Sequence, residues 1–239
     1  MPGYTRRQLK EDKFAETAKG AAHWAEEHRQ TMIWGGGIVL IVVLAAAGLW
    51  TWHNRQTEQA NIELSVALRT FKASLRPPNS PAPADDTTPS FASIADRAKA
   101  AEKQLKSVAD KFPYTSPGKL ARYMEGVASM QAGDNAAAEQ QLKTAAAFGN
   151  KDIAALAKLS LATLYRSTNR PADAVKIYKD LADHPTNTVS KAEAQLDLAE
   201  MYETTDPAQA NSIYQQLQKE DPQSPAAQIA GSKLKPKQP

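Results

Sequence analysis

The sequence predicts an all-α protein, in which one N-terminal transmembrane helix is followed by a stack of antiparallel helix pairs. Three observations support this fold class. An uncharged apolar run, residues 32–52, is long enough to cross a bilayer. Alanine-rich helical patterns recur every 36 or 37 residues from residue 91 onward. Glycine is scarce, with 11 residues in 239, and few runs show the alternation of a strand.

A short charged segment, residues 1–31, precedes the apolar run. Within it, residues 5–30 alternate charged and apolar residues with an imperfect helical spacing. Two interpretations stay open for this segment, an interfacial helix and a solvated, partly ordered tail.

The run MIWGGGIVLIVVLAAAGLWTW, residues 32–52, is interpreted as an uncleaved signal anchor. Its 21 residues would span roughly 31 Å as a helix, about the thickness of a bilayer's hydrocarbon core. Trp34 lies near one end and Trp50 and Trp52 at the other, where indole rings favour the headgroup boundary. Cleavage after the alanines at 45–47 and a buried core helix are the alternatives. Against them, the run continues past the alanines and is apolar on every face.

The flanking charges predict the orientation of this anchor, because more cations precede it than follow it. The cations are Arg6, Arg7, Lys10, Lys13, Lys19 and Arg29 before the run, and Arg55, Arg69 and Lys72 after it. This bias predicts a cytoplasmic N-terminus and places residues 53–239 across the membrane. The chain has no cysteine, which excludes a lipid-anchored lipoprotein and suits an oxidising compartment.

A membrane-proximal helix, residues 53–76, and a proline-rich loop, residues 77–90, are expected next. No proline or glycine separates the anchor from this helix, so the two are predicted to be continuous. The apolar residues of its 55–76 part form one helical stripe, which comprises Ala60, Leu64, Ala67, Leu68, Phe71 and Leu75. The loop contains five prolines, which cannot donate hydrogen bonds to a helix.

The last predicted region, residues 91–235, carries the same apolar trio four times. Each trio reads alanine, a larger apolar residue four positions later and an apolar residue three positions beyond that. The trios are Ala101, Leu105 and Val108; Ala138, Leu142 and Ala145; Ala174, Tyr178 and Leu181; and Ala210, Tyr214 and Leu217. This spacing places each trio on one face of a helix, where the alanine lets a neighbouring helix approach closely.

A partner helix is expected before each of the last three trios. The partner helices are marked by Glu125-Gly126-x2-Ser129, Leu161-Ala162-x2-Tyr165 and Leu198-Ala199-x2-Tyr202. Turn signals follow them at Gly133-Asp134, Asn169-Arg170-Pro171 and Asp206-Pro207, and prolines close units at Pro113, Pro185 and Pro222. A final helix, residues 223–235, is expected to start with Ser224 as its N-cap and Pro225 as its first residue.

These patterns resemble the tetratricopeptide repeat, which has a Leu-Gly/Ala pair, an aromatic three residues on, a small residue across the turn, a second aromatic and a closing proline. The units LATLY…AVKIY…P and LAEMY…ANSIY…P match at nearly every point, whereas the unit before them has Ser129 at the first aromatic position. The resemblance covers residues 91–222. It implies a tetratricopeptide-like α-solenoid with a C-terminal cap helix, whose earliest unit is split by the proline-rich loop.

The order of the parts resembles a narrower family. A start similar to TRRQLKEDKF, one membrane span and a small repeat domain resemble the ancillary SecYEG translocon subunit family of bitopic proteins. This implies a single-pass protein of the bacterial inner (cytoplasmic) membrane with a periplasmic C-terminal domain. Its implied function is a non-enzymatic interaction module that links the translocon to periplasmic chaperones or to envelope assembly. The alternative is a structural or oligomeric scaffold of an envelope or cell-division complex, so homo-oligomerisation stays open.

No pattern in the sequence predicts an enzyme, a cofactor or a metal site. The histidines His23, His28, His53 and His184 lack ligand spacing, and without cysteine there is no thiolate site. Gly35-Gly36-Gly37 is not followed by the Lys-Ser/Thr of a phosphate loop. A formal net charge of +3 provides no basic field for nucleic acid. The expected partners are other proteins and the membrane, with neither nucleic acid nor a small-molecule substrate.

The tetratricopeptide resemblance also predicts a binding groove, lined by the first helix of each pair at positions six and three before the signature Gly/Ala and one and four after it. The predicted groove residues are Tyr123, Val127 and Met130; Leu159, Thr163 and Arg166; and Leu196, Glu200 and Glu203. Leu120, Leu156 and Glu193 hold the remaining positions, and the two leucines are also expected to pack between helices. We expect an apolar groove with an acidic third unit, which would bind an apolar partner segment or this chain's own residues 55–76.

Overall fold

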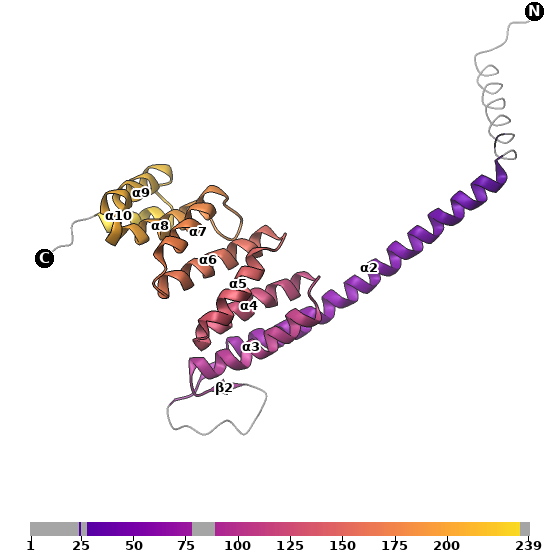
Figure 1. The fold of residues 1–239 in the computed structure, drawn as a ribbon, viewed down its shortest axis with the longest axis horizontal. Helices are drawn as coiled ribbons and strands as arrows, with labels where there is room; N and C mark the ends of the chain where they lie inside the picture. The colour runs from indigo at the N-terminus through magenta and orange to yellow at the C-terminus, as the bar shows by residue number, and fades with distance from the viewer. Residues whose placement is uncertain (1–23, 25–27, 78–88, 235–239) are drawn as a thin grey trace, which may run out of the picture. The chain divides into compact units, whose positions relative to one another are not determined.

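A computed structural model of the chain describes residue 24, residues 28–77 and residues 89–234. These residues are almost entirely helical, and one pair of two-residue strands accompanies the helices (Figure 1). The chain divides into two compact units, Met1–Arg55 and Gln56–Pro239. In this coarse form, the predicted all-α class is confirmed.

Helix α2 (Arg29–Phe71) contains the predicted anchor. Within the described residues it is the one helix that is long and apolar enough to cross a membrane, judged by length and composition. None of its most apolar stretch is buried inside the protein. The helix continues without a break beyond Trp52, so the predicted continuity with the membrane-proximal helix is confirmed. It ends at Phe71 rather than at residue 76.

In the second unit, the part of α2 from residue 56 onward packs against α3 (Ile94–Lys111) and α4 (Ser116–Ala132). Ala60, Leu64 and Ala67 are buried in one cluster with apolar residues of both helices, and Leu68 and Phe71 are half-buried against it. An ion pair between Lys111 and Glu63, and a hydrogen bond from Arg97 Nη1 to the Ala73 carbonyl (3.1 Å), show that α2 and α3 are antiparallel. This segment of α2 therefore takes the place of a first helix beside α3.

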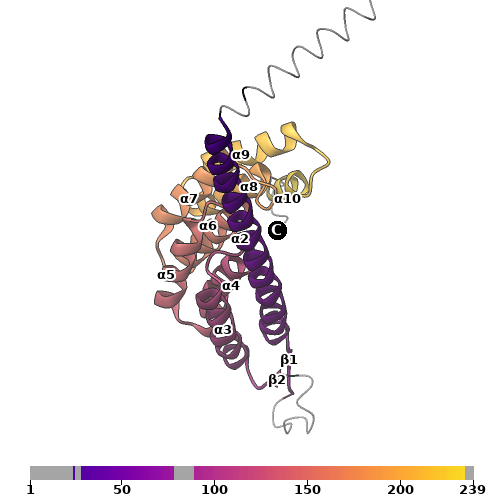
Figure 2. The ribbon, with the colours of Figure 1, turned by 90° about the vertical axis from the view of Figure 1, so that its right-hand side faces the viewer.

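Two strands replace the predicted end of the membrane-proximal helix. β1 (Ser74–Leu75) and β2 (Ser90–Phe91) pair in parallel, with Ser74 opposite Ser90 (Figure 2). The predictions that Leu75 continues the buried helical stripe and that Ser90 lies in a loop are wrong. Leu75 is exposed and lies in β1, beyond the end of α2 at Phe71. Arg76 precedes Pro77, a position that also disfavours helical backbone.

Three helix pairs follow α3, and their bounds agree with the repeats in the sequence. They are α4 with α5 (Asn135–Ala146), α6 (Lys151–Ser167) with α7 (Pro171–Asp183), and α8 (Lys191–Thr205) with α9 (Pro207–Glu220). All members of the four predicted trios are buried, with at most 2% of any of them exposed. At the first crossing, a Cβ on Gly126 would lie 2.8 Å from Leu142 Cγ, so glycine lets α4 and α5 approach.

The predicted turn residues lie between the helices of each pair. Gly133 ends α4 in the left-handed region with φ of 85°, and Asp134 then caps α5 by accepting from Ala137 N at 2.9 Å. Asn169 also has a positive φ, 59°, and lies two residues before the start of α7. Pro171 and Pro207 begin α7 and α9, where the missing N–H has no helical partner to lose.

The last described helix, α10 (Pro225–Leu234), begins as the sequence predicts. Ser224 Oγ accepts a hydrogen bond from Ala227 N at 3.2 Å, and Pro225 is the first helical residue. Ala226 and Ala230 of α10 are buried with apolar residues of α8 and α9.

Two predicted segments lie largely outside the described residues. They are the N-terminal segment 1–31, of which residues 24 and 28–31 are described, and the interior of the proline-rich loop, residues 78–88.

Candidate protein-interaction face

The predicted groove residues lie on three neighbouring helices, α4, α6 and α8. Tyr123 Oη of α4 is 3.4 Å from Ser160 Oγ of α6, and Arg166 Nη1 of α6 donates to Glu200 Oε2 of α8 at 3.3 Å. The structure thus brings residues of adjacent helices together on one face. This face is called the inner face below, and it comprises Tyr123, Val127, Met130, Leu159, Thr163, Arg166, Leu196, Glu200 and Glu203.

The α4 part of the inner face is partly covered by its own neighbours. Tyr123, Val127 and Met130 are half-buried and pack against the apolar core that α5, α6 and α7 build. Leu120 packs into the cluster shared with α2 and α3, and Leu156 packs against residues around α7. These two leucines therefore lie between helices, as predicted, and the apolar surface left for a partner on α4 is limited.

The α6 part of the inner face changes from apolar to cationic along the helix. Leu159 is half-buried against the core, and Thr163 Oγ1 donates to the Leu159 carbonyl at 3.1 Å. One turn further on, Arg166 is exposed and pairs with Glu200. Arg166 is thus the cation next to the acidic residues of α8.

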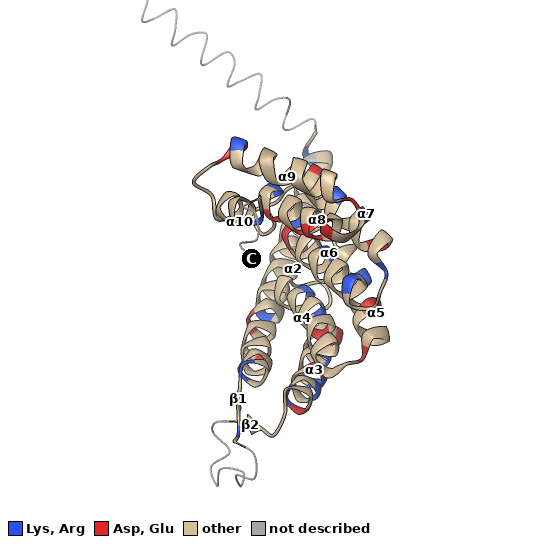
Figure 3. Ribbon diagram, turned by 90° about the vertical axis from the view of Figure 1, so that its left-hand side faces the viewer, with Lys and Arg blue, Asp and Glu red and all other residues tan. Residues whose placement is uncertain are grey.

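The α8 part of the inner face is acidic, and Glu203, like Glu200, already has partners within the protein. Glu203 accepts from Tyr214 Oη at 2.8 Å and pairs with Lys233 Nζ of α10 at 2.9 Å. Leu196 is half-buried against α9 and α10, whereas Glu193 is exposed. Figure 3 shows acidic segments along α8.

Asp197 is a charged residue of α8 that sequence reasoning missed. Burial, together with the negative charges of Glu200 and Glu193, raises its pKa to about 6, while the positive charge of Arg166 partly opposes this shift. The signal was present in the sequence, because residues 193, 197 and 200 follow one helical face. Arg166 and Glu200 therefore lie close enough to Asp197 to shift its pKa in opposite directions.

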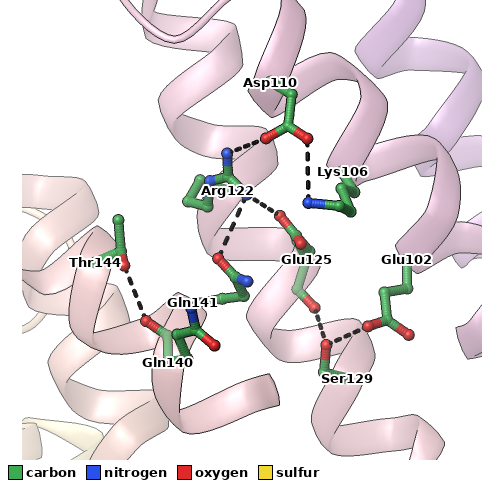
Figure 4. Close-up of polar contacts among 9 residues, drawn as sticks. All are labelled: Glu102, Lys106, Asp110, Arg122, Glu125, Ser129, Gln140, Gln141 and Thr144. Atoms are coloured by element: carbon green, nitrogen blue, oxygen red, sulfur yellow. Dashed lines mark hydrogen bonds and ion pairs between the residues drawn. The ribbon is translucent and has the colours of Figure 1, made fainter.

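A second missed feature is a charge network between α3 and α4, in which Glu125 is buried and Asp110 is exposed (Figure 4). The Arg122 guanidinium bridges Asp110 of α3 and Glu125 of α4, with Nη1 donating to Glu125 Oε2 at 2.7 Å. The hydrogen bond from Arg122 lowers the pKa of Asp110, whereas burial raises the pKa of Glu125. Nearby, Ser129 Oγ donates to Glu102 Oε1 at 2.8 Å. This network lies between helices, away from the inner face.

The next repeat places an aromatic residue where α4 has Ser129. Tyr165 Oη donates to Glu139 Oε1 at 3.0 Å, and the Arg170 guanidinium lies 4.0 Å from the centre of the Tyr165 ring. Hydrogen bonds from Lys143, then Arg170 and Tyr165, lower the pKa of Glu139 to about 2. The Tyr165 hydroxyl therefore ties α6 to α5 at the edge of the core.

The described parts of the chain contain no group of three or more His, Asp or Glu residues that could hold a metal ion. Of the histidines that the sequence analysis considered as metal ligands, His184 is exposed, and its Nδ1 lies 3.2 Å from Asp180 Oδ1.

Antiparallel helix pairs with buried trios, a small residue at each crossing and a shared inner face define a helical-repeat protein. Comparison with known families agrees with this class, because residues 22–187 match the model of a tetratricopeptide repeat-like domain. The match covers more than half of the chain, so the chain belongs to this family. It includes α2 through α7, while α8, α9 and α10 lie beyond it. No curated protein matches the chain. The family indicates a protein-interaction module.

Proposed function

We propose that the protein is a non-enzymatic interaction module tethered to the bacterial inner membrane through residues 32–52, with its repeat domain in the periplasm. The observation that supports this proposal most is that one helix, α2, has two features along its length. The first part of α2 has the length and composition of a membrane span, and the same helix becomes the first helix of the repeat domain. Such a continuous helix holds a binding domain close to the membrane.

The repeat units are proposed to form an α-solenoid that α10 caps. Each repeat helix pair buries its apolar face against its neighbours, so the pairs are stable only when they stack. Ala226 and Ala230 of α10 cover apolar residues of the last pair, including Tyr214 and Leu217. In this arrangement the inner face is the concave side, where partners of repeat proteins commonly bind.

The partners are proposed to be proteins of secretion or envelope assembly, as in the ancillary SecYEG translocon subunit family. What supports the proposal is the order of the parts: a charged N-terminal segment, one apolar run and a small repeat domain. The alternative, a scaffold that self-associates or bridges envelope or cell-division proteins, has the same order. Since no site for chemistry is evident on the inner face, both proposals are binding functions.

The topology is tested with single cysteines, because the chain has none of its own. Lys151 is exposed at the start of α6, so Lys151→Cys should react with a membrane-impermeant maleimide in intact spheroplasts. Thr5→Cys, in the predicted cytoplasmic segment, should react only after lysis. The reverse pattern would overturn the proposed orientation.

The partner class is tested by extraction in mild detergent and identification of the proteins that co-purify with the full-length chain. Glu193→Lys with Glu200→Lys reverses charge on the inner face, and Asp183→Lys with Glu220→Lys is the matched control on exposed residues elsewhere. We expect translocon subunits or periplasmic chaperones with the wild type and the control, but a loss of at least about half of them with the inner-face variant. Self-association or recovery of wall-synthesis proteins alone would favour the scaffold. Equal recovery with both variants would exclude this end of the inner face.

A further inference from the structure

The first helix of the repeat domain has the same register as the first helices of the later pairs. Gly126 in α4 is the small residue at the crossing with Leu142. In α2 that place belongs to Ala67, which is fully buried in the cluster that contains Leu105 of α3. The antiparallel contacts of Glu63 with Lys111 and of Ala73 with Arg97 agree with this alignment.

In each later pair, the positions five before and one before the small residue are buried. They are Ala121 and Glu125 in α4, Ala157 and Leu161 in α6, and Ala194 and Leu198 in α8, each at most 7% exposed. What covers them is the second helix of the preceding pair: α3 covers α4, α5 covers α6 and α7 covers α8. These positions are therefore shaped to receive a helix.

The same two positions in α2 are Ile62 and Val66, and within the described residues of the repeat domain no helix packs over them. Ile62 is 61% exposed and Val66 is 43% exposed. Arg69, two positions after Ala67, is exposed as well, whereas its counterparts Ala128, Leu164 and Met201 are buried. The face of α2 formed by Ile62, Val66, Arg69 and Lys72 is called the open end face below.

The C-terminal part of the open end face is cationic and borders a surface pocket. Arg69 and Lys72 line a surface pocket together with Ser65 and Pro89. The nearest acidic residue of α2, Glu63, is directed to Lys111 of α3. Two apolar side chains are thus followed along the helix by two cations, a pattern that complements an apolar surface with acidic flanks.

We propose that the open end face docks an amphipathic helix of another protein, which carries an apolar stripe flanked by acidic residues. The docked helix takes the position that a preceding repeat helix holds for α4, α6 and α8, and its carboxylates meet Arg69 and Lys72. A second copy of this chain fits less well. Two copies anchored with the same orientation and related by a two-fold axis would bring these cations against each other. This site is separate from the inner face and does not depend on the partners proposed for it.

The test uses the full-length chain in detergent micelles and two fluorescent, lactam-bridged helical peptides of the same leucine pattern. One peptide has glutamates beside the leucine stripe and the other has lysines. Fluorescence anisotropy should show binding of the acidic peptide, weakened about tenfold or more by Ile62→Ser with Val66→Ser. Ile229→Ser, at an exposed apolar residue of α10, is the matched control and should leave binding unchanged.

Charge reversal supplies the decisive comparison. Arg69→Glu with Lys72→Glu should exchange the preference, so that the variant binds the lysine peptide and not the glutamate peptide. The same reversal at the exposed Lys176 and Lys179 of α7 should not do so. Equal binding of both peptides by wild type and variant would overturn the proposal. Efficient disulfide-linked dimers of Val66→Cys that the acidic peptide does not suppress would also overturn it, because a second copy would then be the occupant.

Discussion

Two junctions of the repeat domain, α3 with α4 and α5 with α6, solve the same packing problem with different chemistry. At the first, the positions that usually hold leucine and an aromatic carry Glu125 and Ser129, and both are buried. At the second, the same positions carry Leu161 and Tyr165, also buried. The backbone arrangement is retained, so the repeat geometry does not depend on which chemistry fills the junction.

The difference lies in how each junction responds to the loss of one side chain. Glu125 is held by Arg122, which also binds Asp110, so the polar junction depends on one guanidinium. A buried ion pair contributes little net stability over apolar packing, but removal of one partner leaves an unpaired charge in the interior. The apolar junction spreads its stabilisation over many contacts, with one hydrogen bond from Tyr165 at its edge.

The largest predicted effect is therefore at Arg122. Arg122→Leu should lower the free energy of unfolding by about 3–5 kcal/mol at pH 8, because Glu125 is left buried without its cation. The matched variant is Lys158→Leu, which lies 36 residues later, in the next repeat. The partner of Lys158, Asp180, is solvent-accessible. This substitution should cost no more than about 1 kcal/mol. Urea unfolding of the full-length variants in detergent measures both, and equal losses would show that the burial of Glu125 adds nothing to the cost of losing its cation.

The second effect concerns how closely the helices cross. A Cβ at Gly126 would meet Leu142 Cγ at 2.8 Å and its backbone N at 3.2 Å. Gly126→Ala should therefore destabilise the protein by about 1–3 kcal/mol through overpacking, although alanine is the better helix former. Gly149→Ala is the control, since nothing lies within 4 Å of a Cβ there, and it should stay within about 0.5 kcal/mol. A stabilising Gly126→Ala would show that the crossing can widen to the spacing that Ala162 accepts.

Local patterns made most of the fold predictable. The buried trios such as Ala174, Tyr178 and Leu181 follow from helical spacing alone, because a side chain that recurs every three to four residues stays on one face. Gly133 and Pro171 mark helix ends because their backbone chemistry is itself local. The family that these patterns resemble is confirmed, whereas the narrower translocon-subunit resemblance stays a prediction.

Features that depend on two distant segments were not predictable in this way. Arg122 meets Asp110 only after α3 and α4 have packed, and neither residue stands out in its own helix. The β1–β2 pairing likewise joins the two ends of a proline-rich segment. For the inner face, helical spacing places residues 193, 197 and 200 on one face, but the raised pKa of Asp197 depends on its burial in the folded protein. The exposure of Ile62 could not be predicted from its own helix, because it depends on whether another helix packs over that face.

The third effect concerns Asp197 of α8, a half-buried carboxylate whose pKa is raised by burial, as is that of Glu125 at the polar junction. The folded-state pKa of Asp197 is raised from 3.8 to about 6 by burial and then by Glu200. Its contribution to stability is thus fully present below the unfolded pKa and lost as pH rises through the folded value. Asp197→Asn should raise the free energy of unfolding by about 1–2 kcal/mol at pH 8, and this gain should vanish near pH 4. A gain that does not change with pH would mean that the carboxylate is not electrostatically disfavoured.

The smallest effect compares the two hydroxyls that occupy equivalent positions, Ser129 in α4 and Tyr165 in α6. Each donates to a glutamate of the preceding helix, at 2.8 Å to Glu102 and 3.0 Å to Glu139. Ser129→Ala and Tyr165→Phe each remove one such hydrogen bond, for which about 0.5–1.5 kcal/mol is usual. We expect the loss for Tyr165→Phe to be the smaller one, because Glu139 keeps Lys143 and Arg170 as partners. Thermal unfolding of the two variants in parallel measures the difference. A larger loss for Tyr165→Phe would show that the apolar junction depends on its single hydroxyl more than the polar junction depends on Ser129.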